Sequence, residues 1–221
     1  MAAAGRRRGA LAPGRRGPAG YREEKLSRSS ALSVVLAGVL AAFAQGAGRE
    51  LVLNGDFECS PFEGWREQAW GEFTDTGNCR LGHRPDLDPD PDFEVVVHKL
   101  LNAGYALYQQ VPVSGVDLGF GVSCRLTSKT ENRDYYAAAA VCLEYRDAGD
   151  SLLGETRIFS ATTGHPWRDS PTLHLIGASD SLNWHEYRFN VAEELANLPG
   201  VAPGDIRSIR VVLLAYVDRN G

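Results

Sequence analysis

The stretch that decides the fold is LVLNGDFE, residues 51–58. The spacing of its apolar residues predicts a β-strand in which Leu51, Leu53 and Phe57 face a core. The pair Asn54-Gly55 interrupts this strand and predicts a bend or a bulge. The stretch therefore predicts the opening strand of a β-rich domain.

The chain downstream repeats this pattern of short apolar segments separated by turn residues. In the segment at 105–113, Tyr105 and Leu107 share one face, whereas Tyr108 and Gln110 share the other. Such a pattern predicts an all-β fold, a two-sheet antiparallel β-sandwich. Strands are predicted at residues 93–100, 105–113, 118–126, 135–146, 152–159, 184–191 and 206–217, the last apolar enough for burial on both faces.

Three motifs give this pattern a family likeness. They are LxLNGDFE at 51–58 with Gly64-Trp65 behind it, YALYQQVPV at 105–113 and WxxYxFxV at 184–191. Together they resemble carbohydrate-binding modules of the cellulase C kind, within the galactose-binding-like jelly-rolls. The resemblance covers roughly residues 50–221. It implies a jelly-roll that binds glycan chains without catalysing a reaction.

The resemblance also implies two features at the ends of the domain. Modules of this kind close with one more strand containing an aspartate pair, and no such strand follows residue 217, so a closing strand is expected to be missing from this sequence. They also hold a structural calcium ion near the first and last strands. Glu58 matches the motif glutamate and is the best candidate ligand, with Asp56 second.

The N-terminal segment is predicted to be a secretory leader. Residues 31–44 read ALSVVLAGVLAAFA, an uncharged run preceded by a basic segment and too short for an ordinary membrane span. Ala42 and Ala44 supply the small residues of a cleavage site after Ala44. Residues 1–44 are thus predicted to be a signal peptide and 45–221 a secreted domain. The alternative is a membrane anchor through residues 31–44.

Removal of the leader makes the chain strongly acidic. Of 23 basic and 28 acidic residues, 8 and 2 lie in residues 1–44, so residues 45–221 carry a net charge of −11. This charge disfavours nucleic acid and anionic membranes as partners of the exported domain. It is compatible with calcium.

Four cysteines in an exported chain permit disulfides. Cys59 and Cys79 lie in the irregular N-terminal region and are the preferred pair, closing a loop of about 20 residues that is worth roughly 3 kcal/mol in the chain-entropy model. Cys124 and Cys142 lie in successive strands on opposite registers, and a bond between them would require a bulge. Whether they form a second bridge stays open.

A run of alternating carboxylates, DLDPDPD, occupies residues 86–92. It is either a calcium loop or a solvated acidic turn. The run lacks a glycine for a sharp reversal and a downstream glutamate at EF-hand distance, which favours the acidic turn.

No catalytic residues are predicted. The sequence has no GxSxG, HExxH, Gly-rich phosphate loop or CxxC motif, and its five histidines are scattered. The domain is therefore predicted not to be an enzyme, although it could be attached to a catalytic domain in a longer chain. A lyase or hydrolase on a jelly-roll is the least favoured alternative.

Candidate sugar-binding residues are aromatic and polar side chains on the non-core faces of the predicted strands. Aromatic rings stack on sugar rings, while amides and guanidinium groups bond hydroxyls. Tyr108, Gln110, Arg125 and Tyr136 would line one groove if their strands are neighbours, with Trp70 at its rim. Alternatively, the tyrosines only cover a sheet face. The leading hypothesis is a secreted module that binds an oligo- or polysaccharide, and the second is a sandwich for protein adhesion or envelope structure.

Overall fold

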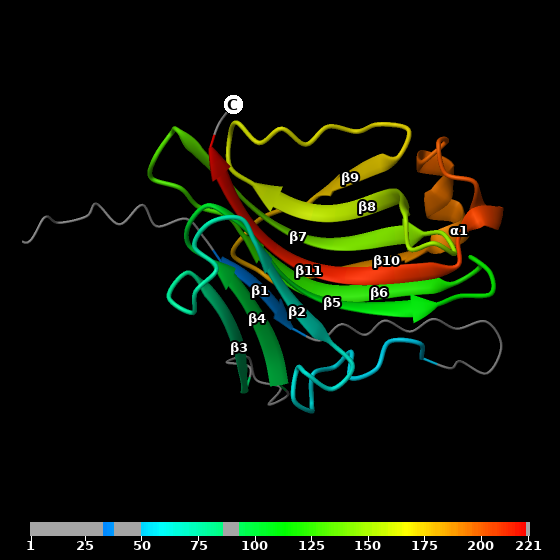
Figure 1. Cartoon of the computed structure of the whole chain (residues 1–221), viewed down its shortest axis with the longest axis horizontal. Helices are drawn as coiled ribbons and strands as arrows, with labels where there is room; N and C mark the ends of the chain where they lie inside the picture. The colour runs from blue at the N-terminus through cyan, green and yellow to red at the C-terminus, as the bar shows by residue number, and fades with distance from the viewer. Residues whose placement is uncertain (1–32, 38–49, 86–92, 220–221) are drawn as a thin grey trace, which may run out of the picture.

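The fold is dominated by strands, as the alternation predicts. The computed structural model describes residues 33–37, 50–85 and 93–219 (Figure 1). Strands make up 51% of the structure, and the described residues contain one short α-helix. The mostly-β class is therefore confirmed. The predicted calcium loop or acidic turn at residues 86–92 lies outside the described residues.

The larger layer is a six-stranded sheet with β11 at its centre (Figure 1). Neighbouring strands are antiparallel except β8 and β9, which run parallel. The prediction of an antiparallel sheet is wrong at this edge, because the connection after β8 returns along the sheet before β9 begins. In spatial order the strands are β2 (Arg66–Trp70), β5 (Ala103–Pro112), β11 (Ser208–Arg219), β7 (Tyr135–Arg146), β8 (Leu152–Ala161) and β9 (Leu173–Gly177).

The second layer consists of two antiparallel pairs with a fifth strand between them. One pair is β10 (His185–Asn190) with β6 (Gly119–Thr127), and the other is β4 (Phe93–Lys99) with β3 (Cys79–Pro85). Strand β1 (Ser33–Ala37) lies between β6 and β4 and is antiparallel to both. It belongs to the segment predicted as a secretory leader. Among the described residues, no helix is long and apolar enough to cross a membrane.

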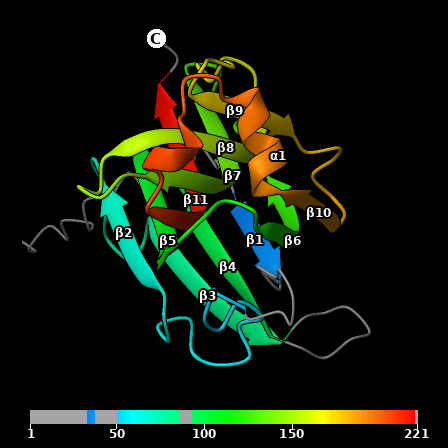
Figure 2. The same ribbon diagram turned by 90° about the vertical axis from the view of Figure 1, so that its right-hand side faces the viewer.

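Side chains from both layers meet in one core. Tyr105 and Leu107 of β5 are buried there, which confirms the register predicted for this strand. The helix α1 (Val191–Glu194), with the 3₁₀ turn that follows it, closes one end of the core (Figure 2). The largest fully buried apolar side chains are Tyr145, Phe57, Phe120, Leu107, Leu126, Leu143, Ile158, Leu198, Ile209 and Leu213.

Residues 51–58 fold into a turn-rich segment, so the prediction of an opening strand is wrong. Asn54 and Phe57 have left-handed φ angles of 49° and 57°, and Leu53, predicted to be inward, is 65% exposed. The Gln109 side chain bonds both the N–H and the C=O of Leu53, at 2.7 and 2.9 Å, in place of a partner strand. Trp65 packs on Phe57 with ring centroids 5.0 Å apart.

All four cysteines are free thiols, so the predicted Cys59–Cys79 disulfide is not found. Cys59 lies exposed in the turn-rich segment, whereas Cys79 is buried at the start of β3, where its Sγ contacts Lys99. Cys124 points into the core and Cys142 lies on the other side of the six-stranded sheet. Their opposite registers keep these two thiols apart.

Thiol labelling of the native, reduced chain should modify Cys59 first. Burial raises the pKa of Cys124 to about 12 and raises the pKa of Cys142 well above its ordinary value. Because the thiolate is the nucleophile, these two thiols should react only when the protein unfolds. Mass spectrometry after brief alkylation, with and without denaturant, measures the order. Rapid native labelling of Cys124 would contradict the placement of β6.

Candidate functional site

The candidate site is the outer face of the six-stranded sheet, the side turned away from the core. In the register of the strands, β5 pairs with β2 on one side and with β11 on the other, and β11 pairs with β7. Small and branched apolar side chains form the middle of this face. They are Ala106, Ala140, Cys142, Val212 and Leu214, all buried beneath larger neighbours.

Aromatic rings gather at one end of the outer face. The ring of Tyr216 lies between those of Trp70 and Tyr136, with centroid distances of 6.4 and 5.9 Å. Trp70 is 38% exposed and Tyr136 only 5%. The indole of Trp70 rests on Gly104, where a Cβ atom would come within 2.0 Å of the ring. A glycine at this position of β5 therefore lets the indole lie against the sheet.

Burial keeps the phenols of this end protonated near neutral pH. It raises the pKa of Tyr216, and the hydrogen bond that the Tyr216 hydroxyl donates to Asp218 raises it further. Burial likewise raises the pKa of Tyr136. The end thus presents neutral rings, which suit packing against the C–H faces of a sugar.

Polar groups surround Tyr108 at the other end of the outer face. The Arg210 guanidinium stacks on the Tyr108 ring at 4.8 Å and donates to Gln110 Oε1 at 2.8 Å. The Gln110 amide donates to Asp150 Oδ1 at 2.8 Å and to Ser208 Oγ at 2.9 Å. These contacts tie two strands, β5 and β11, and the β7–β8 turn into one polar cluster, defined by these five residues.

Two arginines balance the acids of the polar cluster. Arg146 donates to Glu144 at 2.7 Å and pairs with Asp150 at 3.3 Å, and Arg210 pairs with Asp150 at 3.2 Å. The hydrogen bond from Gln110, followed by the charges of both arginines, lowers the pKa of Asp150. The Asp150 carboxylate therefore stays ionised at neutral pH and orients the Gln110 amide.

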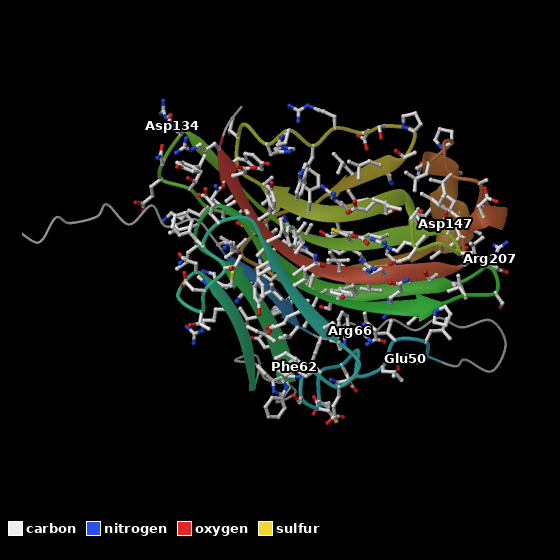
Figure 3. The ribbon with its side chains drawn as sticks, viewed as in Figure 1. Glu50, Phe62, Arg66, Asp134, Asp147 and Arg207 are labelled. Carbon is white, nitrogen blue, oxygen red and sulfur yellow. The ribbon has the colours of Figure 1, made fainter. Side chains whose placement is uncertain are left out.

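A cleft of about 550 Å³ opens beside the polar cluster. Arg66, on edge strand β2, contributes to it and is labelled in Figure 3. Among the residues that the structure describes, Arg66 has no carboxylate partner. Its guanidinium can thus bond a ligand. The cleft is lined by Gly64, Arg66, Tyr108, Gln109, Gln110, Pro112, Asp150, Ser208 and Arg210.

Trp167 also belongs to the outer face, although the sequence gives it no assignable role. It comes from the connection between β8 and β9, which Figure 1 shows running along the edge of the sheet. The Arg157 guanidinium lies 4.3 Å from its ring centroid, and Phe159 packs at 5.8 Å. A Trp between two prolines in a turn-rich stretch has no strand register, so only the folded structure locates it.

Four of the five predicted sugar-binding residues lie on the outer face: Trp70, Tyr108, Gln110 and Tyr136. Arg125 does not, because β6 belongs to the other layer. Its guanidinium packs on the Trp184 ring at 5.4 Å. A single groove containing Arg125 is therefore not formed.

Both predicted calcium ligands accept hydrogen bonds from backbone N–H groups. Glu58 accepts from the Phe93 N–H at 3.0 Å, and Asp56 accepts weakly from the Glu58 N–H at 3.4 Å. Calcium needs six to eight oxygen ligands, and the described parts of the chain gather no group of three acidic, histidine or cysteine side chains suited to a metal. The described residues alone do not fit a calcium site.

Comparison with known protein families and curated proteins finds no relative of this chain. No protein-family model matches the chain, and no curated protein matches its sequence. The functional argument therefore rests on the geometry of the outer face.

Proposed function

We propose that the protein is a non-catalytic carbohydrate-binding module that takes an oligosaccharide across the outer face of the six-stranded sheet. The observation that carries the proposal is that one face presents two separate groups. The rings of Trp70, Tyr216 and Tyr136 lie at one end, and the polar cluster around Tyr108 lies at the other. On the same proposal the two layers form a galactose-binding-like jelly-roll.

The chemistry of the two ends matches the two sides of a sugar. Aromatic rings accept the apolar C–H faces of pyranose rings, and the amide, guanidinium and carboxylate groups bond the hydroxyls. Gly104 and Gln110 are six residues apart on β5, a separation of roughly 20 Å at strand spacing. Because one sugar ring cannot reach both ends, the ligand is an oligosaccharide chain.

Titration calorimetry against soluble plant and microbial polysaccharides tests the proposal. Tyr108→Ala removes the ring of the polar cluster and should weaken binding by about 1 kcal/mol, roughly fivefold in Kd. The matched control is Arg125→Ala, which removes a cation stacked on an aromatic ring in the other layer. Its affinity should equal that of the wild type, with nearly unchanged melting temperatures in both variants.

Failure to bind any glycan would overturn the proposal, as would equal losses in the two variants. In that case the second candidate, a module for protein adhesion, takes precedence. A specific observation favours this alternative: the middle of the outer face is already covered by its own side chains, with Trp167, Phe159 and Tyr216 packed over buried alanines.

A further inference from the structure

A lysine is completely buried at the end of β4. Lys99 has 0% exposure, and within the described residues it has no carboxylate partner. Lysine is almost never fully buried unless it is paired, because an isolated ammonium ion is costly to remove from water. The neighbours of Lys99 must therefore account for its burial.

The neighbour is a cysteine directly across the sheet. In the antiparallel register of β3 and β4, Cys79 is the cross-strand partner of Lys99, so the two side chains are adjacent on one face. Lys99 Nζ donates to Cys79 Sγ at 3.2 Å and to the Phe73 carbonyl at 2.5 Å. Cys79 is itself only 8% exposed. The amine and the thiol are thus held together in a nearly dry site.

We propose that Lys99 and Cys79 form a covalent N–O–S cross-link when the chain meets molecular oxygen. The oxidant is dioxygen, a molecule small and apolar enough to enter a buried site. The proposed linkage joins Lys99 Nζ to Cys79 Sγ through one oxygen atom.

The step balances with dioxygen as the only co-reactant. In total, R–SH, R′–NH₂ and O₂ give R–S–O–NH–R′ and one water, so the thiol and the amine each lose one hydrogen. Sulfur and nitrogen each lose two electrons, and dioxygen takes up all four.

Stated bond by bond, the net change is simple. One S–H bond of Cys79, one N–H bond of the Lys99 amine and the O–O bond break, while one S–O bond and one O–N bond form. The second N–H bond of the amine survives in the linkage. The two released hydrogens leave with the other oxygen atom as water.

The cross-link would stabilise the region next to the aromatic end of the outer face. Lys99 Nζ already holds the carbonyl of Phe73, in the loop that follows Trp70. Covalent attachment of Lys99 to Cys79, where that loop ends, fixes β3 to β4 at this point. The modification therefore provides an oxygen-dependent covalent link in the layer behind the outer face.

Intact-mass and peptide mass spectrometry of the full chain test the proposal. The chain is purified under reducing conditions, then divided into an anaerobic sample and an air-exposed sample. The air-exposed chain should gain the mass of one oxygen atom and lose that of two hydrogens. After digestion, trypsin should fail to cleave at Lys99, and the peptide containing Cys79 should stay attached to the one containing Lys99 until a thiol reductant is added.

Two variants serve as controls. Lys99→Met keeps the apolar length of the side chain but removes the amine, and Cys79→Ser removes the sulfur, so neither should show the mass shift. A Cys59–Cys79 disulfide, oxygen atoms added to Cys79 alone, or an unchanged mass in air would each overturn the proposal. The wild-type measurement decides the matter even if a variant does not fold.

Discussion

Replacing Gly104 with alanine is expected to cost the protein about tenfold or more of its glycan affinity. A Cβ atom at this position would lie 2.0 and 2.3 Å from two ring atoms of Trp70, closer than any tolerated contact. The indole can rotate, whereas the backbone of β5 is held in the sheet. Trp70 should therefore leave the outer face, so that only Tyr216 and Tyr136 remain of the three rings at this end. Trp70 then loses its contact with Tyr216 and its proposed contact with the sugar, and at about 0.5–1.5 kcal/mol each these two losses account for the tenfold change.

Calorimetry measures the affinity, and tryptophan fluorescence reports whether the indole has moved into water. The matched control is Gly82→Ala, on β3 of the other layer, where the new Cβ would meet Val96 at 3.4 Å, an ordinary contact. This variant should bind like the wild type. Full affinity in Gly104→Ala would show that Trp70 takes no part in binding.

Strands with one buried face could be predicted from the sequence because burial imposes a period of two. The bounds predicted for β7 agree with those of the structure, and Leu107 and Val111 face the core as expected. The outward positions of Tyr108 and Gln110 follow from the same alternation. Here the local pattern and the packing agree.

Segments without such a pattern were not predictable. Strand β2, REQAW, is exposed along its whole length, and only its pairing with β5 defines it. Residues 51–58 have apolar side chains at strand spacing but form turns, since Asn54 bonds Cys59 and Ser60 locally and Gln109 bonds Leu53 from far along the chain. Long-range side-chain bonds of this kind leave no periodic signal.

The candidate site depends on which strands are neighbours, and alternation says nothing about that. Strand β6 follows β5 in sequence but lies in the other layer, which removes Arg125 from the face. Strand β11 lies between β5 and β7 and brings Arg210 to Tyr108 and Gln110. The polar cluster is thus assembled by topology from residues that are distant in sequence.

The second large effect should follow removal of residues 1–44, the predicted leader. Because Ser33–Ala37 pairs with both β4 and β6, its loss opens the second layer between these strands and leaves backbone groups on both edges without partners. At a net contribution of about 1 kcal/mol for each hydrogen bond, the free energy of unfolding should fall by several kcal/mol. The two open edges should also promote association between molecules.

Denaturant titration and light scattering of the chain beginning at Gln45 measure both effects. The matched control lacks residues 1–31 only and keeps Ser33–Ala37, so it should unfold at the same denaturant concentration as the full chain. Glycan binding should survive in both forms, because the outer face belongs to the six-stranded sheet. If the chain beginning at Gln45 is as stable and as monomeric as the control, the second layer closes without Ser33–Ala37 and that segment serves as a leader alone.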